Sequence, residues 1–224
     1  MTVPSDKRAD LTRQHILSAA ARQFAHRPYT QVSLDDILDE ARVTKGAMYF
    51  HFRSKYALAV AIIDEQTDMA RLAANEVLAR RLSGIETLVD LLYLFAVRDI
   101  GNEVARAAFN LLEGIGRAGG VQTKLLGQWA DSFALVLRRA IDEGDVMDHV
   151  HPETAGRLLV ALYMGLRQIS DLADPHKFFT DLEALWMLIL PGLVIADRIG
   201  YLTQFIKRRT SLASNTPSIR VDSP

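Results

Sequence analysis

Residues 33–55 have the sequence SLDDILDEARVTKGAMYFHFRSK. Ser33 is followed three residues later by Asp36, which is the spacing of a capping box at the start of a helix. Apolar residues then recur at helical spacing as far as Ala41, so residues 33–41 predict a short helix with one buried face.

A break and a second short helix follow. Arg42 and Val43 interrupt the first pattern, and Thr44 is a favourable N-cap for a helix that extends to about Phe50. Two short helices joined by a turn of this length are typical of the helix-turn-helix unit, whose second helix lies in the major groove of DNA. The sequence therefore predicts a DNA-binding head.

The second helix has a surface suited to duplex DNA. Small side chains at Gly46 and Ala47 would let the backbone approach the bases closely, while Lys45 could reach a guanine edge or a phosphate. Tyr49 and His51 could donate hydrogen bonds to phosphate oxygens. The predicted DNA contacts are Ser33, Thr44, Lys45, Gly46, Ala47, Tyr49, His51 and Lys55. The alternative interpretation is an ordinary helical hairpin with a solvated polar face.

The segment TKGAMYFHF at residues 44–52, preceded by SLDDI, resembles the DNA-binding domain of the TetR family of bacterial transcriptional repressors. The resemblance covers roughly residues 10–57. It is specific, because the turn, the small residues, the Tyr and the H-F pair all stand at the expected spacing. A helix expected from Thr12 to about Arg27 would pack across the other two and complete a three-helix head.

Composition sets limits for the rest of the chain. Its 224 residues are 49% hydrophobic, which is enough for one large or two small packed domains. It has no Cys, so disulfide and thiol chemistry are excluded and a cytoplasmic protein is expected. No apolar run approaches the roughly 18 residues of a membrane span, and the polar first residues contain no signal-peptide pattern. We therefore expect no membrane partner.

The remaining periodicity is helical throughout. We expect helices over residues 54–81, 85–100, 102–112, 121–143, 152–173 and 180–201, and Pro191 could kink the last one. The predicted fold class is all-α, with about nine or ten helices. An N-terminal three-helix head is joined by the long helix at 54–81 to a C-terminal helical domain for ligand binding and dimerisation.

The expected domain boundaries are residues 1–55 for the helix-turn-helix domain, 56–206 for the ligand-binding and dimerisation domain, and 207–224 for a disordered tail. Residues 1–10 are expected to form a flexible arm. Residues 1–60 contain nine Lys and Arg against six Asp and Glu, a net charge of +3. This excess lies on the part proposed to bind DNA and supports that interpretation.

Gly114, Gly116 and Gly119 satisfy the G-x-G-x-x-G fingerprint of dinucleotide-binding proteins. That fingerprint functions between a buried strand and a helix, whereas the residues before it here are helix formers, so we interpret it as a loop between helices. His149 and His151 are interpreted as solvated loop residues rather than metal ligands. Since no nucleophile elbow or zinc-ligand set is found, the prediction is a protein that is not an enzyme and has no cofactor or metal.

Large apolar residues and a few polar groups are combined between Tyr93 and Gln168. Such a mixture suits a mostly apolar pocket with a few convergent hydrogen-bonding groups. The candidate ligand-binding residues are Tyr93, Phe109, Trp129, Phe133, Tyr163, Met164 and Gln168. Ordinary core packing is the alternative for each of them, and Trp129 is the strongest candidate.

The same region resembles the regulatory domain of the γ-butyrolactone receptor branch of the TetR family, in the segments NEVARAAFNLL, QW, EGDVMDHV and ILPGL. The resemblance implies that Trp129 lines the ligand pocket and that a small lactone releases the repressor from DNA. Asn110, where the pattern of that branch has an Arg, and the loop at 114–120 depart from the resemblance. A fatty-acyl derivative, a steroid-like lipid or a drug is the alternative effector. The alternative function is an all-α interaction module that does not bind DNA.

Oligomeric state follows from the geometry of DNA. One helix-turn-helix contacts only a few base pairs, so such proteins normally dimerise to span half-sites roughly 34–36 Å apart. The helices expected at 152–173 and 180–201 have more apolar surface than one core can cover, and the resemblance likewise implies a dimer interface there. We expect a homodimer on palindromic double-stranded operator DNA. An effector beside Trp129 would change the packing of the body and pivot the helix at 54–81.

Overall fold

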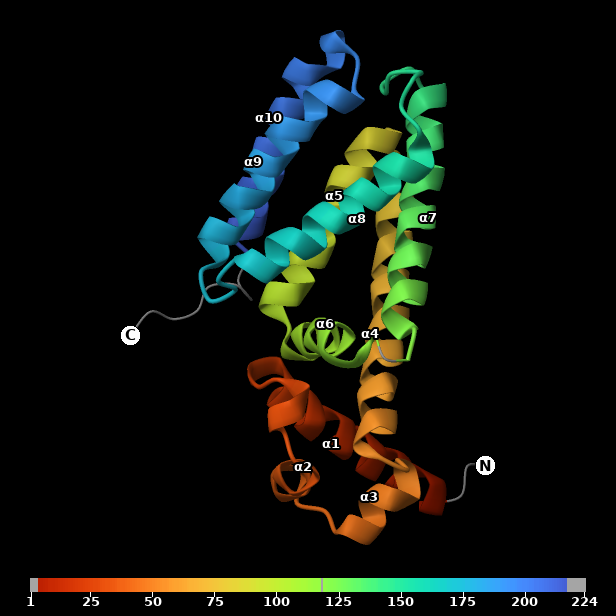
Figure 1. The fold of residues 1–224 in the computed structure, drawn as a ribbon, viewed down its shortest axis with the longest axis vertical. Coiled ribbons are helices and arrows are strands. Elements are labelled where there is room, and N and C mark those ends of the chain that lie inside the picture. Colours follow the sequence, from red (N-terminus) through yellow and green to blue (C-terminus); the bar gives the residue numbers. More distant parts are fainter. Residues whose placement is uncertain (1–3, 118, 217–224) are drawn as a thin grey trace. The chain divides into compact units, whose positions relative to one another are not determined.

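The computed structural model describes residues 4–117 and 119–216, and the side chains from Ala9 onward. Every regular element of these residues is helical, which confirms the all-α prediction. The α-helices are α1 (Pro4–His26), α2 (Leu34–Ala41), α3 (Lys45–His51), α4 (Lys55–Leu78), α5 (Gly84–Gly101), α6 (Glu103–Ile115), α7 (Val121–Asp142), α8 (Pro152–Ile169), α9 (Pro175–Leu193) and α10 (Ala196–Ser214). A short 3-10 helix, η1 (Tyr29–Gln31), precedes α2. Figure 1 shows these helices in the order in which the chain forms them.

The chain divides into two compact units that are interleaved in sequence. Residues up to Arg71 together with Asn102–Gln122 form the first unit, and Leu72–Gly101 together with the residues from Thr123 onward form the second. The helix α4 therefore contributes to both units. This division differs from the boundary at residue 55 that was expected from the sequence, because α6 packs on α1 within the first unit.

The first unit is built around a small apolar core. Phe24 of α1, Ile37 of α2 and Met48 of α3 are completely buried, so each of the three N-terminal helices contributes a side chain to it. The predicted capping box is present, since Ser33 Oγ accepts from Asp36 N at 3.0 Å and Asp36 Oδ2 accepts from Ser33 N at 2.8 Å. Arg42 has the left-handed backbone conformation, with φ of 52°, that ends α2 and turns the chain towards α3.

The expectation about the N-terminal residues is wrong. The flexible arm was expected to include residues 1–10, but α1 begins at Pro4 rather than near Thr12. A proline fits the first turn of a helix, because its missing N–H has no partner within the helix there. Residues 1–3 lie outside the described part of the chain.

The C-terminal helix expected at 180–201 is two helices, α9 and α10, joined by the extended Val194 and Ile195. The loop before α8 holds this break, because Val146 pairs with Val194 and the Ile195 N–H donates to the Asp145 carbonyl at 3.1 Å. The disordered tail was expected from residue 207, yet α10 extends to Ser214. Residues 217–224 lie outside the described residues.

The second unit has a large aromatic core. Its largest completely buried side chains include Phe178, Phe179 and Trp186 of α9. Asp99 of α5 and Arg167 of α8 form an ion pair in which both side chains are buried, and Nε lies 2.7 Å from Oδ2. A buried pair of this kind fixes the position of α5 against α8, since an offset of either helix would leave an uncompensated charge. No described helix is long and apolar enough to span a membrane.

Candidate functional site

The outward face of α3 is defined by how the helix is fixed to the rest of the first unit. Met48 is completely buried and Phe52, just after the helix, is 5% exposed, so these two side chains set the orientation of α3. Thr44 caps the helix, because its Oγ1 accepts from the Ala47 N–H at 3.2 Å. The opposite face of α3 is left to solvent.

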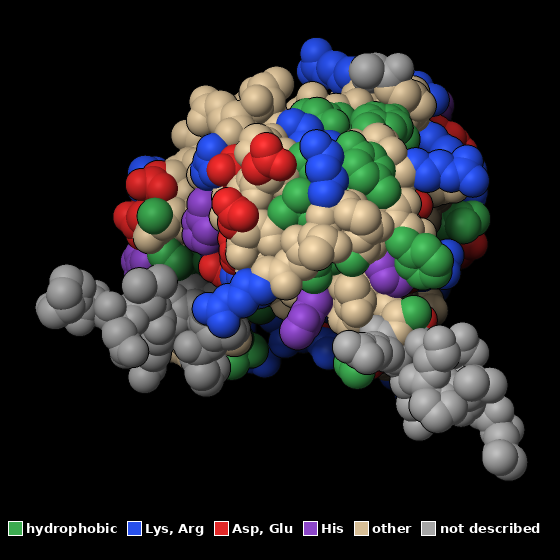
Figure 2. Space-filling model, turned by 90° about the horizontal axis from the view of Figure 1, so that it is seen from below, with side chains coloured by type: hydrophobic (Ala, Val, Ile, Leu, Met, Phe, Trp, Pro, Cys, Tyr) green, Lys and Arg blue, Asp and Glu red, His purple; other side chains and the backbone are tan. Residues whose placement is uncertain are grey.

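Most of the predicted DNA contacts lie on this exposed face. Ser33, Thr44, Lys45, Gly46 and Tyr49 are exposed, and Ala47 and His51 are half-buried. No bond from Lys45 to another described side chain is found, so its ammonium group is available. Figure 2 shows the molecule from below, with Lys, Arg and His side chains among apolar ones and not gathered in a single patch. The outward face of α3 therefore has hydrogen-bond donors and small side chains that are open to solvent.

Lys55 was also predicted to contact DNA, but its ammonium group lies in a different environment from the side chains on α3. Its Nζ donates to the carbonyls of Tyr29 and Val32, at 2.9 and 2.7 Å, and lies 4.1 Å from the centre of the Tyr29 ring. Burial lowers the pKa of this ammonium group. Because two of its three N–H donors bond to these carbonyls, Lys55 stabilises the loop before α2.

Phe50 was not among the predicted contacts, yet it is 79% exposed on α3. Its ring meets that of His51 edge-on, with the centroids 5.0 Å apart. An exposed aromatic ring on a groove-binding helix can contact a thymine methyl group or a sugar. The sequence could have indicated this contact, because Phe50 lies between Tyr49 and His51, which were both predicted to face DNA.

In the second unit, Trp129 and Phe133 of α7 meet Phe95 of α5. The Phe95 and Trp129 rings stack with centroids 5.6 Å apart and an interplanar angle of 17°, and the Phe133 ring lies 6.3 Å from that of Phe95. Phe133 and Phe95 are buried, whereas Trp129 is half-buried. These three side chains, here called the Trp129 cluster, form an apolar surface that remains partly accessible at the indole.

The other predicted ligand-binding residues are not in this cluster. Tyr93 stacks on Phe179 with centroids 6.3 Å apart, and Tyr163 lies edge-on to Phe178, so both belong to the aromatic core around α9. The Tyr93 hydroxyl and Thr210 Oγ1 are 2.6 Å apart, and burial raises the pKa of Tyr93, so the phenol stays protonated. Met164 is half-buried, Gln168 is exposed, and Phe109 lies half-buried on α6 in the first unit.

The ion pair between Asp99 and Arg167 was not predicted from the sequence. The two residues are 68 positions apart, and nothing in the local pattern of either helix indicates that their side chains meet. Asp99 follows Phe95 by one helical turn on α5, which places a charged, fully paired group one turn along from the Trp129 cluster.

The glycines of the G-x-G-x-x-G fingerprint lie at the end of α6 and in the following turn, with no described strand before them. Two of these glycines, Gly116 and Gly119, lie too close to neighbouring atoms for a side chain. A Cβ on Gly116 would lie 2.3 Å from the Leu112 carbonyl oxygen, and one on Gly119 would lie 2.1 Å from the Tyr56 hydroxyl oxygen. The interpretation as a loop between helices fits this environment. Among the described residues, no group of three or more His, Cys, Asp or Glu is placed to hold a metal ion.

Comparison with known proteins gives the family. The model of the family described as bacterial regulatory proteins, tetR family, matches residues 16–62. The chain is 34% identical to the A-factor receptor protein of Streptomyces griseus, over 87% of this chain and 68% of that protein. The chain belongs to the TetR family. It is a TetR-family transcriptional repressor, and its relatives are transcriptional regulators.

Solved structures of TetR-family proteins have the same fold. A crystal structure of a γ-butyrolactone receptor, an ArpA-like protein, has a TM-score of 0.74 at 28% identity and covers 92% of this chain and 98% of its own. CprB from Streptomyces coelicolor, in complex with its biological operator sequence, has a TM-score of 0.76 at 28% identity and covers 93% of this chain and 100% of its own. Both predicted resemblances are thereby confirmed.

Proposed function

We propose that this TetR-family repressor binds a palindromic operator as a homodimer in the cytoplasm and leaves it when a small apolar effector binds beside Trp129. A γ-butyrolactone is the first candidate effector. The observation that carries the proposal is the outward face of α3, where Lys45, Gly46 and Tyr49 are exposed while Met48 is completely buried. A helix held in this way presents small and hydrogen-bonding side chains to a groove.

Dimerisation is supported by the apolar side chains that α8 and α9 leave exposed. Leu158 is 44% exposed, Ile169 84% and Leu188 77%, which is unusual for three large aliphatic residues on two neighbouring helices. An apolar surface of this kind is typical of a protein–protein interface. A second copy of the chain would cover it and provide the second α3 that a palindrome requires.

The effector site is supported by the chemistry of the Trp129 cluster and by the names of relatives. The cluster is aromatic and partly accessible, which suits a mostly apolar molecule. One relative is an A-factor receptor and another is a γ-butyrolactone receptor. A fatty-acyl derivative, a lipid or a drug would use the same apolar surface and is the alternative.

An effector can act only by binding the DNA-free form more tightly than the DNA-bound form. A hundredfold difference in its affinity for the two forms corresponds to about 2.7 kcal/mol of bias. The helix α4 contributes residues to both units and is the element through which such a bias would reach α3.

Inverted repeats in the DNA upstream of the protein's own gene provide the test. Binding to a labelled repeat is measured by fluorescence anisotropy, with a scrambled repeat of equal length as the control. We expect tight, salt-dependent binding to the repeat alone. Equal affinity for both DNAs at physiological salt would contradict the assignment of α3 as a sequence-reading helix.

The effector is tested on the same complex by adding γ-butyrolactones, acyl derivatives or drugs. We expect one class to release the protein, and we expect Trp129→Ala to bind the operator normally but to need at least tenfold more effector. Undiminished release from Trp129→Ala would place the effector site elsewhere.

A further inference from the structure

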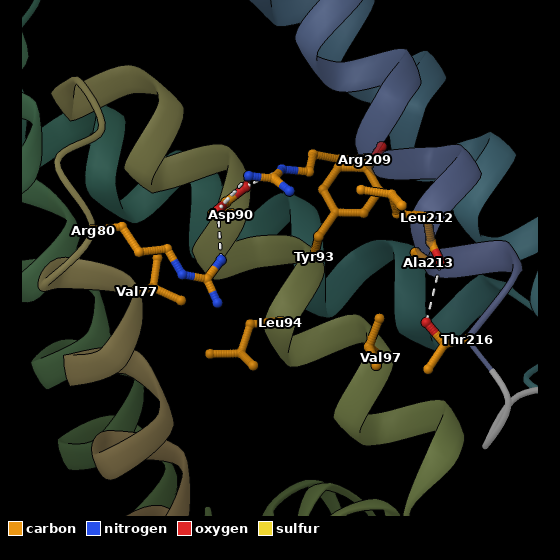
Figure 3. A pocket seen from close by; sticks show the side chains of 10 residues that line it. All are labelled: Val77, Arg80, Asp90, Tyr93, Leu94, Val97, Arg209, Leu212, Ala213 and Thr216. Atoms are coloured by element: carbon orange, nitrogen blue, oxygen red, sulfur yellow. Dashed lines mark hydrogen bonds and ion pairs between the residues drawn. The ribbon is translucent and has the colours of Figure 1, made fainter.

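The second unit contains a pocket that the proposed function does not use. It measures about 300 Å³ and lies between the end of α4, α5 and α10. Its apolar lining comes from Val77, Leu94, Val97 and Leu212, and none of the residues of the Trp129 cluster lines it. Figure 3 shows the pocket with these side chains around it.

The polar side of this pocket holds two cations and one anion. The Asp90 carboxylate lies 3.1 Å from Arg80 Nη1, and 2.5 and 2.9 Å from Arg209 Nε and Nη2. Figure 3 shows the two guanidinium groups reaching Asp90 from different sides. One carboxylate neutralises only one guanidinium group, so the three side chains leave a net charge of about +1 facing the pocket.

Arg80 is the cation that remains available to a ligand. The Asp90 side chain is 3% exposed and that of Arg209 25%, whereas that of Arg80 is 53% exposed. Within the described residues, Arg80 makes no second side-chain hydrogen bond besides the one to Asp90. A guanidinium group has five N–H donors, so Arg80 retains donors that match the two oxygens of a carboxylate.

We propose that this pocket binds an amphiphilic monoanion, a carboxylate on a short apolar chain. The carboxylate would accept hydrogen bonds from Arg80, and the chain would lie along Leu94 and Val97, both of which are half-buried. A pocket of this volume holds about ten non-hydrogen atoms, taking roughly 30 Å³ for each water-sized group. Octanoate has about that many atoms and combines the two required parts.

Binding of sodium octanoate to the full-length protein, measured by isothermal titration calorimetry without DNA, tests the proposal. We expect a dissociation constant below about 1 mM. Octan-1-ol, which has the chain but no charge, is expected to bind at least tenfold more weakly. Arg80→Gln should weaken octanoate binding at least tenfold, and Arg80→Lys should weaken it less.

The matched control is Arg71→Gln, which removes the same charge from an exposed position on α4 where the Arg71 side chain pairs with Asp68. This variant should bind octanoate as the unchanged protein does. Thermal unfolding shows whether Arg80→Gln is folded. If it is not, Leu94→Glu replaces it, since a carboxylate in the pocket should abolish octanoate binding.

Three results would overturn the proposal. The first is no detectable octanoate binding, and the second is equal affinity for octanoate and octan-1-ol. The third is octanoate binding that Trp129→Ala abolishes while Arg80→Gln or Leu94→Glu leaves it unchanged. That third result would place octanoate at the Trp129 cluster instead.

Discussion

Lys45 and Lys55 stand ten positions apart in the first unit, yet their ammonium groups have different environments. Lys45 is exposed on α3, whereas Lys55 Nζ donates to the carbonyls of Tyr29 and Val32. The first charge can be used for a phosphate or a guanine edge, and the second offsets the partial negative charges of two backbone carbonyls.

Lys45→Ala should therefore weaken operator binding without changing stability. We expect a loss of about 1–3 kcal/mol for each half-site, or about 5- to 150-fold, because each protomer of the proposed dimer loses one charge-assisted contact with DNA. Fluorescence anisotropy gives the affinity, and thermal unfolding should give an unchanged midpoint.

The control for Lys45→Ala is Lys124→Ala, which removes an exposed lysine from α7 and should leave affinity unchanged. The salt dependence separates the two possible partners of Lys45. If Lys45 contacts a phosphate, the negative slope of log K against log salt should become shallower by about 0.9 for each protomer, and if it contacts a base the slope stays the same. Operator binding by Lys45→Ala equal to that of the unchanged protein would remove α3 from the interface.

At the level of elements, α6 has the most informative packing. It lies against α1 in the first unit, with Ala105, Ala108 and Leu111 among its buried residues. Alanines let two helices approach closely, and the Asn110 side-chain amide then donates to the carbonyls of Phe24 and Ala25, at 2.9 and 3.2 Å. The carbonyls in the last turn of a helix lack partners within it, so Asn110 caps α1 from a neighbouring helix.

Asn110→Ala should destabilise the protein by about 1 kcal/mol, since two carbonyls of α1 lose a donor. Urea unfolding followed by circular dichroism measures the change. The control is Asn75→Ala at an exposed position of α4, which gains the same helix propensity without losing a described hydrogen bond. Equal midpoints for the two variants would mean that Asn110 contributes no stability through this cap.

At the level of the whole molecule, the two units are interleaved in the chain, and we propose different tasks for them. The first unit carries α3 and the second carries the Trp129 cluster and the exposed apolar residues of α8 and α9. The chain passes from one unit to the other within α4, between α5 and α6, and near the start of α7. A repressor of this construction is complete only as the dimer that we propose, because one α3 reads one half-site.

Leu188→Glu tests the proposed dimer. Leu188 is 77% exposed, so a charge there should change the stability of the monomer little. Burial of that charge at a dimer interface is strongly unfavourable. We expect monomers at micromolar concentration by sedimentation velocity, and operator binding weakened at least tenfold. Leu135→Glu, at a position 63% exposed on α7, is the control and should remain dimeric. A dimeric Leu188→Glu would place the interface elsewhere.

The sequence by itself determined the local elements of the head. Ser33, Asp36 and Thr44 specify where α2 and α3 begin, because caps are satisfied within a few residues of the chain. The exposed faces of α8 and α9 were indicated by helical spacing, since their apolar residues exceed what one side of a helix can bury.

Only the tertiary structure decided which distant segments meet. The packing of α6 on α1, the break between α9 and α10, and the ion pair of Asp99 with Arg167 each join residues far apart in the chain. The same is true of Lys55, whose acceptors come from a loop more than 20 residues earlier. The local periodicity of the sequence does not predict such contacts. They depend on how complete helices pack and on which buried polar groups then need a hydrogen-bond partner.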